Sequence, residues 1–360
     1  MKAAVCREFG QPMLVEDLTL DPPQTGEIKV KVHACAICHS DILYWSGGWG
    51  GSLPAVYGHE AAGVVEEIGD GVTAVTVGDH VVVTLVRSCG RCFFCAKGQT
   101  HLCEGTFALQ SETRLHDANG EPVLQALNTA GFAEYVVVDQ SQVAKVPGDM
   151  RMDSASLMAC GVITGLGAVT NTAQMPYGSS VVVIGCGGVG LSSIQGAALS
   201  GGQPIIAVDL VDSKLEAALE FGATHTINPT KEDALARVKE LTNGRGADYV
   251  FMAAGSGKAI EQGLDLMRIG GTICLVGMPA SGVKMIVEAA NFAGYSQSIL
   301  GSKMGSTTLQ VDIPKLVELY QQGRLKLDEM VTKHYKVEEI NEAIAAVERG
   351  EALRNVIVFE

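Results

Sequence analysis

Residues 1–147 contain short hydrophobic runs in which apolar and polar positions alternate, and glycine or proline separates one run from the next. A side-chain period of two is typical of β-strands that bury one face. The runs expected to be strands are 28–32, 63–68, 79–83 and 134–138. This part of the chain is therefore predicted to form a mostly β domain.

From about residue 155 the pattern changes to wholly apolar runs, each followed by a segment with helical periodicity. The predicted strand–helix pairs are 180–184 with 189–200, 205–208 with 212–221, and 248–252 with 259–267. Strands that alternate with helices indicate an α/β fold with a parallel sheet. Beyond residue 302, a helix around 316–320, a second helix at 337–349 and a strand at 355–359 are expected to return to the first domain.

A chain of 360 residues is long enough for two domains. The expected boundaries are 1–160 together with 303–360 for the first domain, and 161–302 for the second. The least regular stretch, residues 104–129, is polar and is interpreted as a lid or an interface loop.

The net charge of −14 argues against binding to nucleic acid or to an anionic membrane surface. The start of the sequence lacks the features of a signal peptide, and no apolar run approaches the ~18 residues that a membrane span needs. A cytoplasmic protein is expected. Its ten cysteines are then metal ligands or buried apolar residues rather than disulfides.

Four cysteines fall within fifteen residues, at Cys89, Cys92, Cys95 and Cys103. A loop of this length can wrap four thiolates around a tetrahedral zinc ion, which leaves no open position and so indicates a structural site. Unrelated cysteines, an iron–sulfur cluster and a zinc ribbon for nucleic acid are the alternatives. The polar surroundings oppose the first of these, and the acidic charge opposes the last.

A second, dispersed set consists of Cys38, His59 and Cys160. Two thiolates and one imidazole leave a fourth position open, and an open position lets zinc act as a Lewis acid. Taken by their spacing alone, these three residues are only weak evidence for a metal site. Cys35, Cys6, Cys186 and Cys274 lie in or beside apolar runs and are expected in the core.

A glycine-rich turn follows the predicted strand 180–184 and opens a helix; its glycines are Gly185, Gly187, Gly188 and Gly190. In this context the glycines allow a pyrophosphate to approach the helix N-terminus. Asp209 ends the next strand, nineteen residues after Gly190. Its carboxylate can accept hydrogen bonds from ribose hydroxyls and would repel a 2′-phosphate, so NAD is expected rather than NADP. The alternative for Asp209 is a helix N-cap.

These three patterns, in this order, resemble the zinc-dependent medium-chain alcohol dehydrogenases over nearly the whole chain, and most closely their long-loop class III branch. The segments that carry the resemblance are 58–65, 160–165, 184–192, 220–224 and 312–317. The resemblance implies a GroES-like, mostly β catalytic domain and a Rossmann domain with a doubly wound parallel sheet.

The resemblance also implies roles for individual residues. Cys38, His59 and Cys160 would bind a catalytic zinc, with Glu60 as an occasional fourth ligand and Asp41 orienting His59. Cys89, Cys92, Cys95 and Cys103 would bind a second, structural zinc. The residues expected to bind NAD are Thr164, Gly185, Gly187, Gly188, Val189, Gly190, Asp209, Lys214, Val276, Met278 and Arg354. His39 would join Arg354 near the pyrophosphate, and Ser40 would accept the hydroxyl proton.

Two positions depart from the family. Leu43 stands where better-known members carry the outer histidine of a proton relay, and residues 47–52 lack the acidic groups of the glutathione-adduct branch. Arg114 is either that branch's anion-binding arginine or an exposed loop residue. The inferred walls of the substrate pocket are Leu43, Trp49, Leu85, Phe132 and Met278.

The expected activity is reversible NAD-linked oxidation of a primary or simple secondary alcohol by a homodimer, with a tetramer as the alternative assembly. An S-(hydroxymethyl)glutathione dehydrogenase is the nearest alternative activity. A zinc-free quinone or enone reductase, and a zinc-lobe binding protein without catalysis, are more distant alternatives.

Overall fold

The computed structural model describes residues 1–360, which divide into two compact units. The first unit comprises Met1–Cys160 and Thr308–Glu360, and the second comprises Gly161–Thr307.

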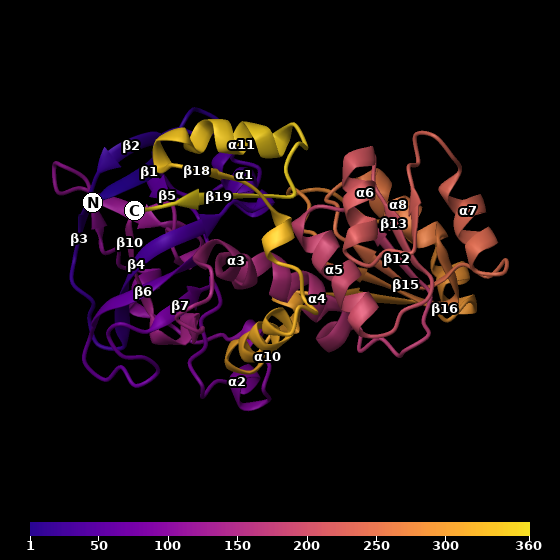
Figure 1. Ribbon diagram of the computed structural model, residues 1–360, viewed down its shortest axis with the longest axis horizontal. Coiled ribbons are helices and arrows are strands. Elements are labelled where there is room, and N and C mark those ends of the chain that lie inside the picture. The colour runs from indigo at the N-terminus through magenta and orange to yellow at the C-terminus, as the bar shows by residue number, and fades with distance from the viewer. The chain divides into compact units, whose positions relative to one another are not determined.

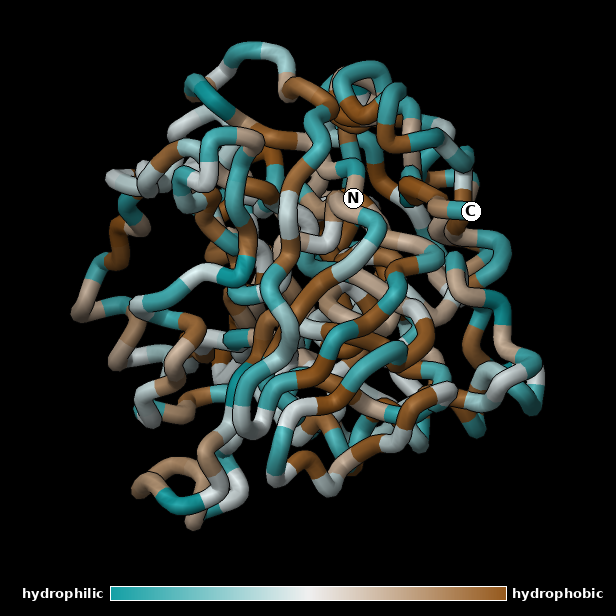
Figure 2. Tube along the Cα trace, turned by 90° about the vertical axis from the view of Figure 1, so that its left-hand side faces the viewer, coloured by the Kyte–Doolittle hydropathy of each residue, from teal (hydrophilic) through white to brown (hydrophobic).

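The first unit contains two β-sheets, as the alternating sequence pattern predicts. One sheet has the order β2 (Leu14–Asp17), β1 (Lys2–Cys6), β5 (Ala55–Val56), β9 (Pro122–Gln125), β8 (Leu115–His116) and β3 (Thr19–Leu20). The other has the order β11 (Val143–Lys145), β7 (His80–Val83), β6 (Glu60–Ile68), β4 (Glu27–Ala36), β19 (Arg354–Val358) and β18 (Val331–Tyr335), with β10 (Tyr135–Asp139) also paired to β4. Figure 2 shows hydrophobic residues along the strands of this unit and hydrophilic ones in many of its loops.

Strand β4 organises the second of these sheets. Its residues alternate between buried and half-buried along most of its length, and it pairs antiparallel with β6, β10 and β19. The pairing with β19 brings the end of the chain back to the first unit, where Figure 1 shows the yellow β19 among indigo strands. The helices of this unit are α1 (His39–Trp45), α2 (Phe93–Ala96), α3 (Met152–Leu157), α10 (Leu309–Gln321) and α11 (Ile340–Glu348).

The irregular stretch 104–129 is not a free lid. Its strands β8 and β9 are internal members of the first sheet, and Leu115 and Val123 are buried in its core. Strands of two and four residues are too short for periodicity to reveal them.

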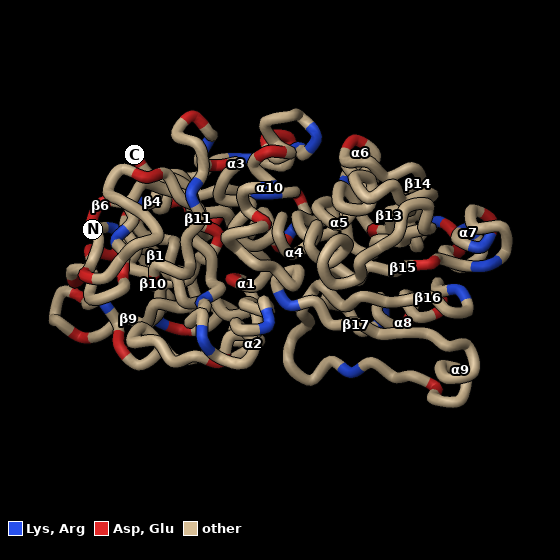
Figure 3. Tube along the Cα trace, turned by 90° about the horizontal axis from the view of Figure 1, so that it is seen from below, with Lys and Arg blue, Asp and Glu red and all other residues tan.

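The second unit is built on a parallel sheet with the order β14 (His225–Ile227), β13 (Ile205–Val208), β12 (Val181–Ile184), β15 (Ala247–Met252), β16 (Met267–Leu275) and β17 (Ser298–Gly301). Every residue of the central strand β12 is buried, which explains its continuous apolar run. The helices are α4 (Ile163–Gly167), α5 (Gly188–Leu199), α6 (Asp212–Glu220), α7 (Ala234–Leu241), α8 (Gly257–Asp265) and α9 (Ala289–Gly294). Figure 3 shows α5 and α6 toward the top of this unit and α9 at the bottom. The strand order has β12 in the middle, with β13 and β14 to one side and β15, β16 and β17 to the other, so the predicted doubly wound fold is confirmed.

One helical stretch, Met152–Thr172, is long and apolar enough to span a membrane. However, 83% of its most apolar window is buried inside the protein, as in a core helix. The boundary between the two units, after Cys160, falls within this stretch.

A network of charges in the first unit holds α3 against β18. Asp153 accepts hydrogen bonds from Arg151 at 2.6 Å and lies 2.8 Å from Nε2 of His334. Burial raises the pKa of Asp153. Its hydrogen bonds to Arg151, His334 and the backbone of Ser154 lower the pKa by more than burial raises it, so the resulting value is about 2. The ionised carboxylate therefore stabilises the fold.

We expect Asp153→Asn to lower the free energy of unfolding by about 1 kcal/mol near neutral pH. Because the pKa is lower in the folded state, this stabilisation is complete above the unfolded value of about 4 and is lost as the pH falls through about 2. Urea unfolding at several pH values checks this, with exposed Asp149→Asn as the control. An Asp153→Asn difference that is independent of pH between 6 and about 2 would contradict it.

Candidate active site and metal centres

The first unit gathers four possible metal ligands in its interior. The donor atoms of Cys38, His59, Glu60 and Cys160 all lie within 4.8 Å of one another, and all four residues are buried. Cys38 is the N-cap of α1, His59 immediately precedes β6, and Cys160 lies in the helical turn η5 (Met158–Val162). The fold thus brings together the dispersed residues that spacing alone left weakly supported.

Asp41, which is fully buried, holds two of these ligands in place. Its carboxylate accepts hydrogen bonds from the backbone N–H groups of Cys38 at 2.9 Å and Gly58 at 3.0 Å, and it contacts Nδ1 of His59 at 2.9 Å. The other ring nitrogen, Nε2, is buried without a hydrogen-bond partner. A buried imidazole nitrogen without a partner is costly, whereas a carboxylate on the opposite nitrogen is typical of a metal-binding histidine.

The buried groups of this cluster shift one another's pKa values. Hydrogen bonding from Cys160 holds the pKa of the Cys38 thiol well below its usual range. Burial raises the pKa of Glu60 to about 7, although the positive charge of Arg354 opposes the shift. Two thiols and an imidazole are the ligand types that zinc prefers, so these residues fit a zinc ion.

Arg354 forms a buried ion pair with Glu60. Its side chain is only 5% exposed, and its Nε has no hydrogen-bond partner. The structure therefore gives Arg354 a partner beside the ligand set, and its role at a pyrophosphate stays a prediction.

The cysteine loop, residues 89–103, forms the second ligand set. The four sulfur atoms of Cys89, Cys92, Cys95 and Cys103 lie within 4.8 Å of one another. Backbone N–H groups point at these sulfurs, including Cys92 N to Cys89 at 3.3 Å and Cys95 N to Cys92 at 3.4 Å. Hydrogen bonding from the backbone of Cys95 lowers the pKa of Cys92 to about 6. Burial, in contrast, raises the pKa of Cys95 to about 12. Four thiols gathered in this way fit a closed, tetrahedral zinc site.

Helix α1 begins at the first ligand set and carries the predicted catalytic residues. His39 is exposed, whereas Ser40 and Leu43 are half-buried. Ser40 and Leu43 are three residues apart and so lie on one face of the helix. The loop of residues 47–52 packs beside this face, because a Cβ added at Gly48 would lie 3.3 Å from the side chain of Leu43.

The aromatic residues near α1 form a small cluster. Trp49 packs edge-on against Tyr44 with ring centroids 5.1 Å apart, and Tyr44 stacks on Tyr57 at 6.2 Å. Phe132 is fully buried, and a Cβ at Gly58 would lie 2.7 Å from its ring. Phe132 thus packs beneath the loop that leads to His59, which is a supporting role rather than that of an open pocket wall.

The second unit carries the glycine-rich turn at the carboxyl end of β12. Gly187 is the N-cap of α5, and a Cβ there would meet no atom within 4 Å. A Cβ at Gly190, by contrast, would lie 1.7 Å from the carbonyl oxygen of Gly185. An open approach to a helix N-terminus, with close packing of the helix behind it, fits a dinucleotide pyrophosphate.

Asp209 directly follows β13 and connects the end of this strand to the glycine-rich turn by a hydrogen bond. Its carboxylate accepts hydrogen bonds from the backbone N–H of Cys186 at 2.7 Å and of Val211 at 3.0 Å. The N-cap of α6 is Val211, so the helix-cap alternative for Asp209 is excluded. Each oxygen keeps acceptor capacity for a ribose hydroxyl.

A largely apolar cavity of about 540 Å³ adjoins Asp209. Among its lining residues are Leu210, Ala254, Ser256, Lys258 and Gln262, none of which the sequence pattern had suggested. The sequence could have indicated most of these residues, because they follow β15 directly. The carboxyl ends of neighbouring parallel strands meet at one edge of the sheet, and ligands bind there. The remaining predicted cofactor residues are dispersed in this unit: Thr164 in α4 and Val276 after β16 are buried, Val189 in α5 and Lys214 in α6 are half-buried, and Met278 is 62% exposed.

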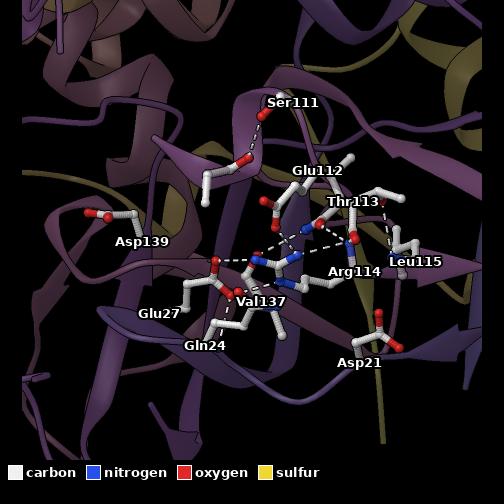
Figure 4. Close-up of polar contacts among 12 residues, drawn as sticks. Asp21, Gln24, Glu27, Ser111, Glu112, Thr113, Arg114, Leu115, Val137 and Asp139 are labelled. Atoms are coloured by element: carbon white, nitrogen blue, oxygen red, sulfur yellow. Dashed lines mark hydrogen bonds and ion pairs between the residues drawn. The ribbon is translucent and has the colours of Figure 1, made fainter. Parts of the chain in front are cut away.

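Arg114 is neither an exposed loop residue nor a free anion ligand. Its guanidinium is 3% exposed and donates to Glu27 at 2.7 and 2.9 Å and to Glu112 at 2.9 Å. Figure 4 shows the guanidinium between these two carboxylates. All three of its nitrogens are occupied, so Arg114 tethers its loop to β4 instead of presenting a positive charge to a substrate.

A dinucleotide-binding fold together with one closed and one open thiolate-rich metal site defines a zinc-dependent oxidoreductase. Two family models match the chain: "Alcohol dehydrogenase GroES-like domain" over residues 24–148 and "Zinc-binding dehydrogenase" over residues 188–322. The alcohol dehydrogenase class-3 of Cereibacter sphaeroides is 36% identical and covers 99% of both chains. The S-(hydroxymethyl)glutathione dehydrogenase of Saccharomyces cerevisiae is also 36% identical, over 99% of this chain and 95% of its own.

Among solved structures, the benzyl alcohol dehydrogenase of Acinetobacter calcoaceticus superposes with a TM-score of 0.93 at 34% identity, covering 100% of this chain and 99% of its own. The chain belongs to the zinc-dependent alcohol dehydrogenase family. It is accordingly an enzyme that uses zinc and a nicotinamide dinucleotide, as the sequence predicts.

Proposed function

We propose that this protein oxidises primary or simple secondary alcohols reversibly, with NAD as the hydride acceptor. One observation carries the proposal: Cys38, His59 and Cys160 form a buried ligand set in which the fourth group, Glu60, is engaged by Arg354. The other three groups would bind the zinc ion and leave its fourth position available to a substrate oxygen.

Zinc bound at this set supplies a Lewis acid that lowers the pKa of an alcohol, and NAD supplies the hydride acceptor. The chain's own residues do the rest. Asp41 holds His59 and Cys38 in position, Ser40 accepts the hydroxyl proton, and apolar side chains such as Leu43 and Trp49 exclude water and favour aliphatic or aromatic alcohols over polyols. Cys89, Cys92, Cys95 and Cys103 would hold the structural zinc.

For the cofactor, Gly185, Gly187, Gly188, Val189 and Gly190 would receive the pyrophosphate, with Asp209 and Lys214 at the adenosine ribose. Thr164, Val276 and Met278 are proposed for the nicotinamide end, and His39 and Arg354 for the phosphate charge. We further propose a cytoplasmic homodimer, which is consistent with an open edge at β17 in the second unit's sheet.

An S-(hydroxymethyl)glutathione dehydrogenase is the second candidate, because a relative of that name covers nearly the whole chain. Two features oppose it: Arg114 is already paired, and residues 47–52 carry no charge. A screen that follows NADH absorbance with simple alcohols, and with glutathione plus formaldehyde, distinguishes the candidates. Activity with the glutathione adduct alone would contradict the proposal.

We expect Asp209→Gly to lower the ratio of NAD to NADP efficiency at least tenfold, about 1.4 kcal/mol of differential binding. The change removes both the ribose acceptors and the repulsion of a 2′-phosphate. The ratio of kcat/KM for the two cofactors measures the effect.

The same change also removes two backbone hydrogen bonds within the unit. Asp209→Asn keeps the side-chain shape while removing the charge, so it separates repulsion from loss of structure. An unchanged ratio in Asp209→Gly would rule out Asp209 as the selector.

A further inference from the structure

Arg87, which lies in the segment between β7 and the cysteine loop, is a buried cation that pairs with no carboxylate. Its side chain is 6% exposed, and it donates to Oε1 of Gln142 at 2.7 Å and to the carbonyl oxygen of Asn128 at 3.2 Å. Its third nitrogen, Nη1, is buried without a hydrogen-bond partner. The guanidinium also lies over the ring of Phe107, 5.9 Å from its centroid, but no carboxylate forms an ion pair with it. Burying a charge without an ion-pair partner is costly, and features of this kind tend to occur where function requires them.

The two acceptors belong to a wider set of contacts, which we call the Arg87 clamp (Arg87, Asn128 and Gln142). Gln142 donates to the carbonyl oxygens of Thr84 at 2.8 Å and Asn128 at 3.0 Å. Asn128 donates in turn to the carbonyl oxygen of Leu85 at 3.0 Å. The clamp thus joins the segments 84–87 and 126–130.

Both segments run beside the ligand set of the first unit. Strand β7 pairs with β6 in a register that places Val83 opposite Ala61. The first segment begins directly after Val83, and β6 begins directly after His59. Directly after the second segment, Gly131 donates to the carbonyl oxygen of Gly58 at 2.7 Å, and Phe132 donates to that of Tyr57 at 2.9 Å.

The second segment needs external support to hold its shape. Leu127, Asn128 and Ala130 all have φ between 51° and 61°. This left-handed region is unfavourable for residues other than glycine, and such residues persist only where their surroundings fix them. The clamp supplies that restraint through both the side chain and the carbonyl of Asn128.

We infer that Arg87 is a positioning residue for the substrate pocket. Through Gln142 and Asn128 it fixes the segments that carry the half-buried residues Leu85 and Leu127, and so it determines which alcohols are admitted. The inference rests on the proposed function, because it concerns the pocket of the same site.

The test uses zinc-loaded enzyme with NAD and a series of 1-alkanols from ethanol to 1-octanol, together with benzyl alcohol. Arg87→Met removes the charged fork at similar length, and Asn128→Gly removes the bond to Leu85 while tolerating the positive φ. Arg324→Met, which changes an exposed arginine of the same unit, is the control. We expect both clamp variants to compress the ratio of kcat/KM between the best and worst alcohols at least tenfold, mainly through KM, and Arg87→Lys to restore part of it.

Hydrogen exchange measured on residues 84–88 and 126–131 reports on the clamp without turnover. We expect faster exchange there in both clamp variants and no change in Arg324→Met. An equal fall in kcat/KM for every alcohol, or unchanged exchange in Asn128→Gly, would overturn the inference. Wild-type enzyme inactive on every alcohol would contradict the proposed function instead, and the exchange data would still decide whether the clamp exists.

Discussion

Replacing Cys38 by serine is expected to abolish turnover and leave the fold intact, whereas replacing Cys95 by serine is expected to destabilise the protein first. Cys38 belongs to the buried set with His59 and Cys160, where an open position is needed for chemistry. Cys95 belongs to the closed set, whose metal contributes folding free energy directly, on the order of several kcal/mol.

Zinc content, thermal unfolding and kcat measured on both variants check this expectation. Each variant should fall from two zinc ions per chain to one, but only Cys95→Ser should unfold at a markedly lower temperature. Cys6→Ser is a matched control, because Cys6 is a fully buried thiol of the same unit outside both sets. Fully active wild-type enzyme with a single zinc ion per chain would show that the assignment is wrong.

Ser40→Ala is expected to slow the hydride step by roughly 10²–10⁴, the range associated with general acid–base groups. Leu43 occupies the next turn on the same face of α1 and cannot carry a proton onward, so the proton should pass from Ser40 to water. His39→Gln should accordingly weaken NAD binding and leave the pH dependence of this step nearly unchanged.

Single-turnover rates from about pH 5.5 to 9 test this route. Ser40→Thr keeps the hydroxyl and should retain most of the rate, and Ser46→Ala, at the exposed end of α1, should have no effect. Leu43→His should add an ionisation and speed oxidation at low pH if proton removal limits the rate there. If His39→Gln removes a pKa that the wild type shows, His39 is the base and the water route is wrong.

Much of the fold could be predicted from the sequence because its elements have strong periodicity. The predicted helix 189–200 is observed as Gly188–Leu199, and the predicted strand 205–208 is observed with the same bounds. The helical stretch Met152–Thr172 was missed. It contains Gly161, Gly165 and Gly167, which have low helix propensity, and it is stabilised by burial rather than by its local sequence.

In the candidate site, residues close together in sequence could be predicted, whereas contacts between distant residues could not. Cysteines close together in sequence, such as Cys89 and Cys92, signal a metal site directly. The contact of Glu60 with Arg354, by contrast, joins residues 294 positions apart and leaves no local pattern. The same holds for Arg114, whose position in a polar stretch suggested exposure although Glu27 in β4 pairs with it in the interior.

The most direct test of the account is the appearance of NADH absorbance when purified enzyme is mixed with NAD and a primary alcohol such as ethanol or benzyl alcohol. The account predicts NADH formation by wild-type enzyme that carries two zinc ions per chain, and none by Cys38→Ser. Zinc-loaded wild-type enzyme that binds NAD but forms no NADH with any alcohol would contradict it.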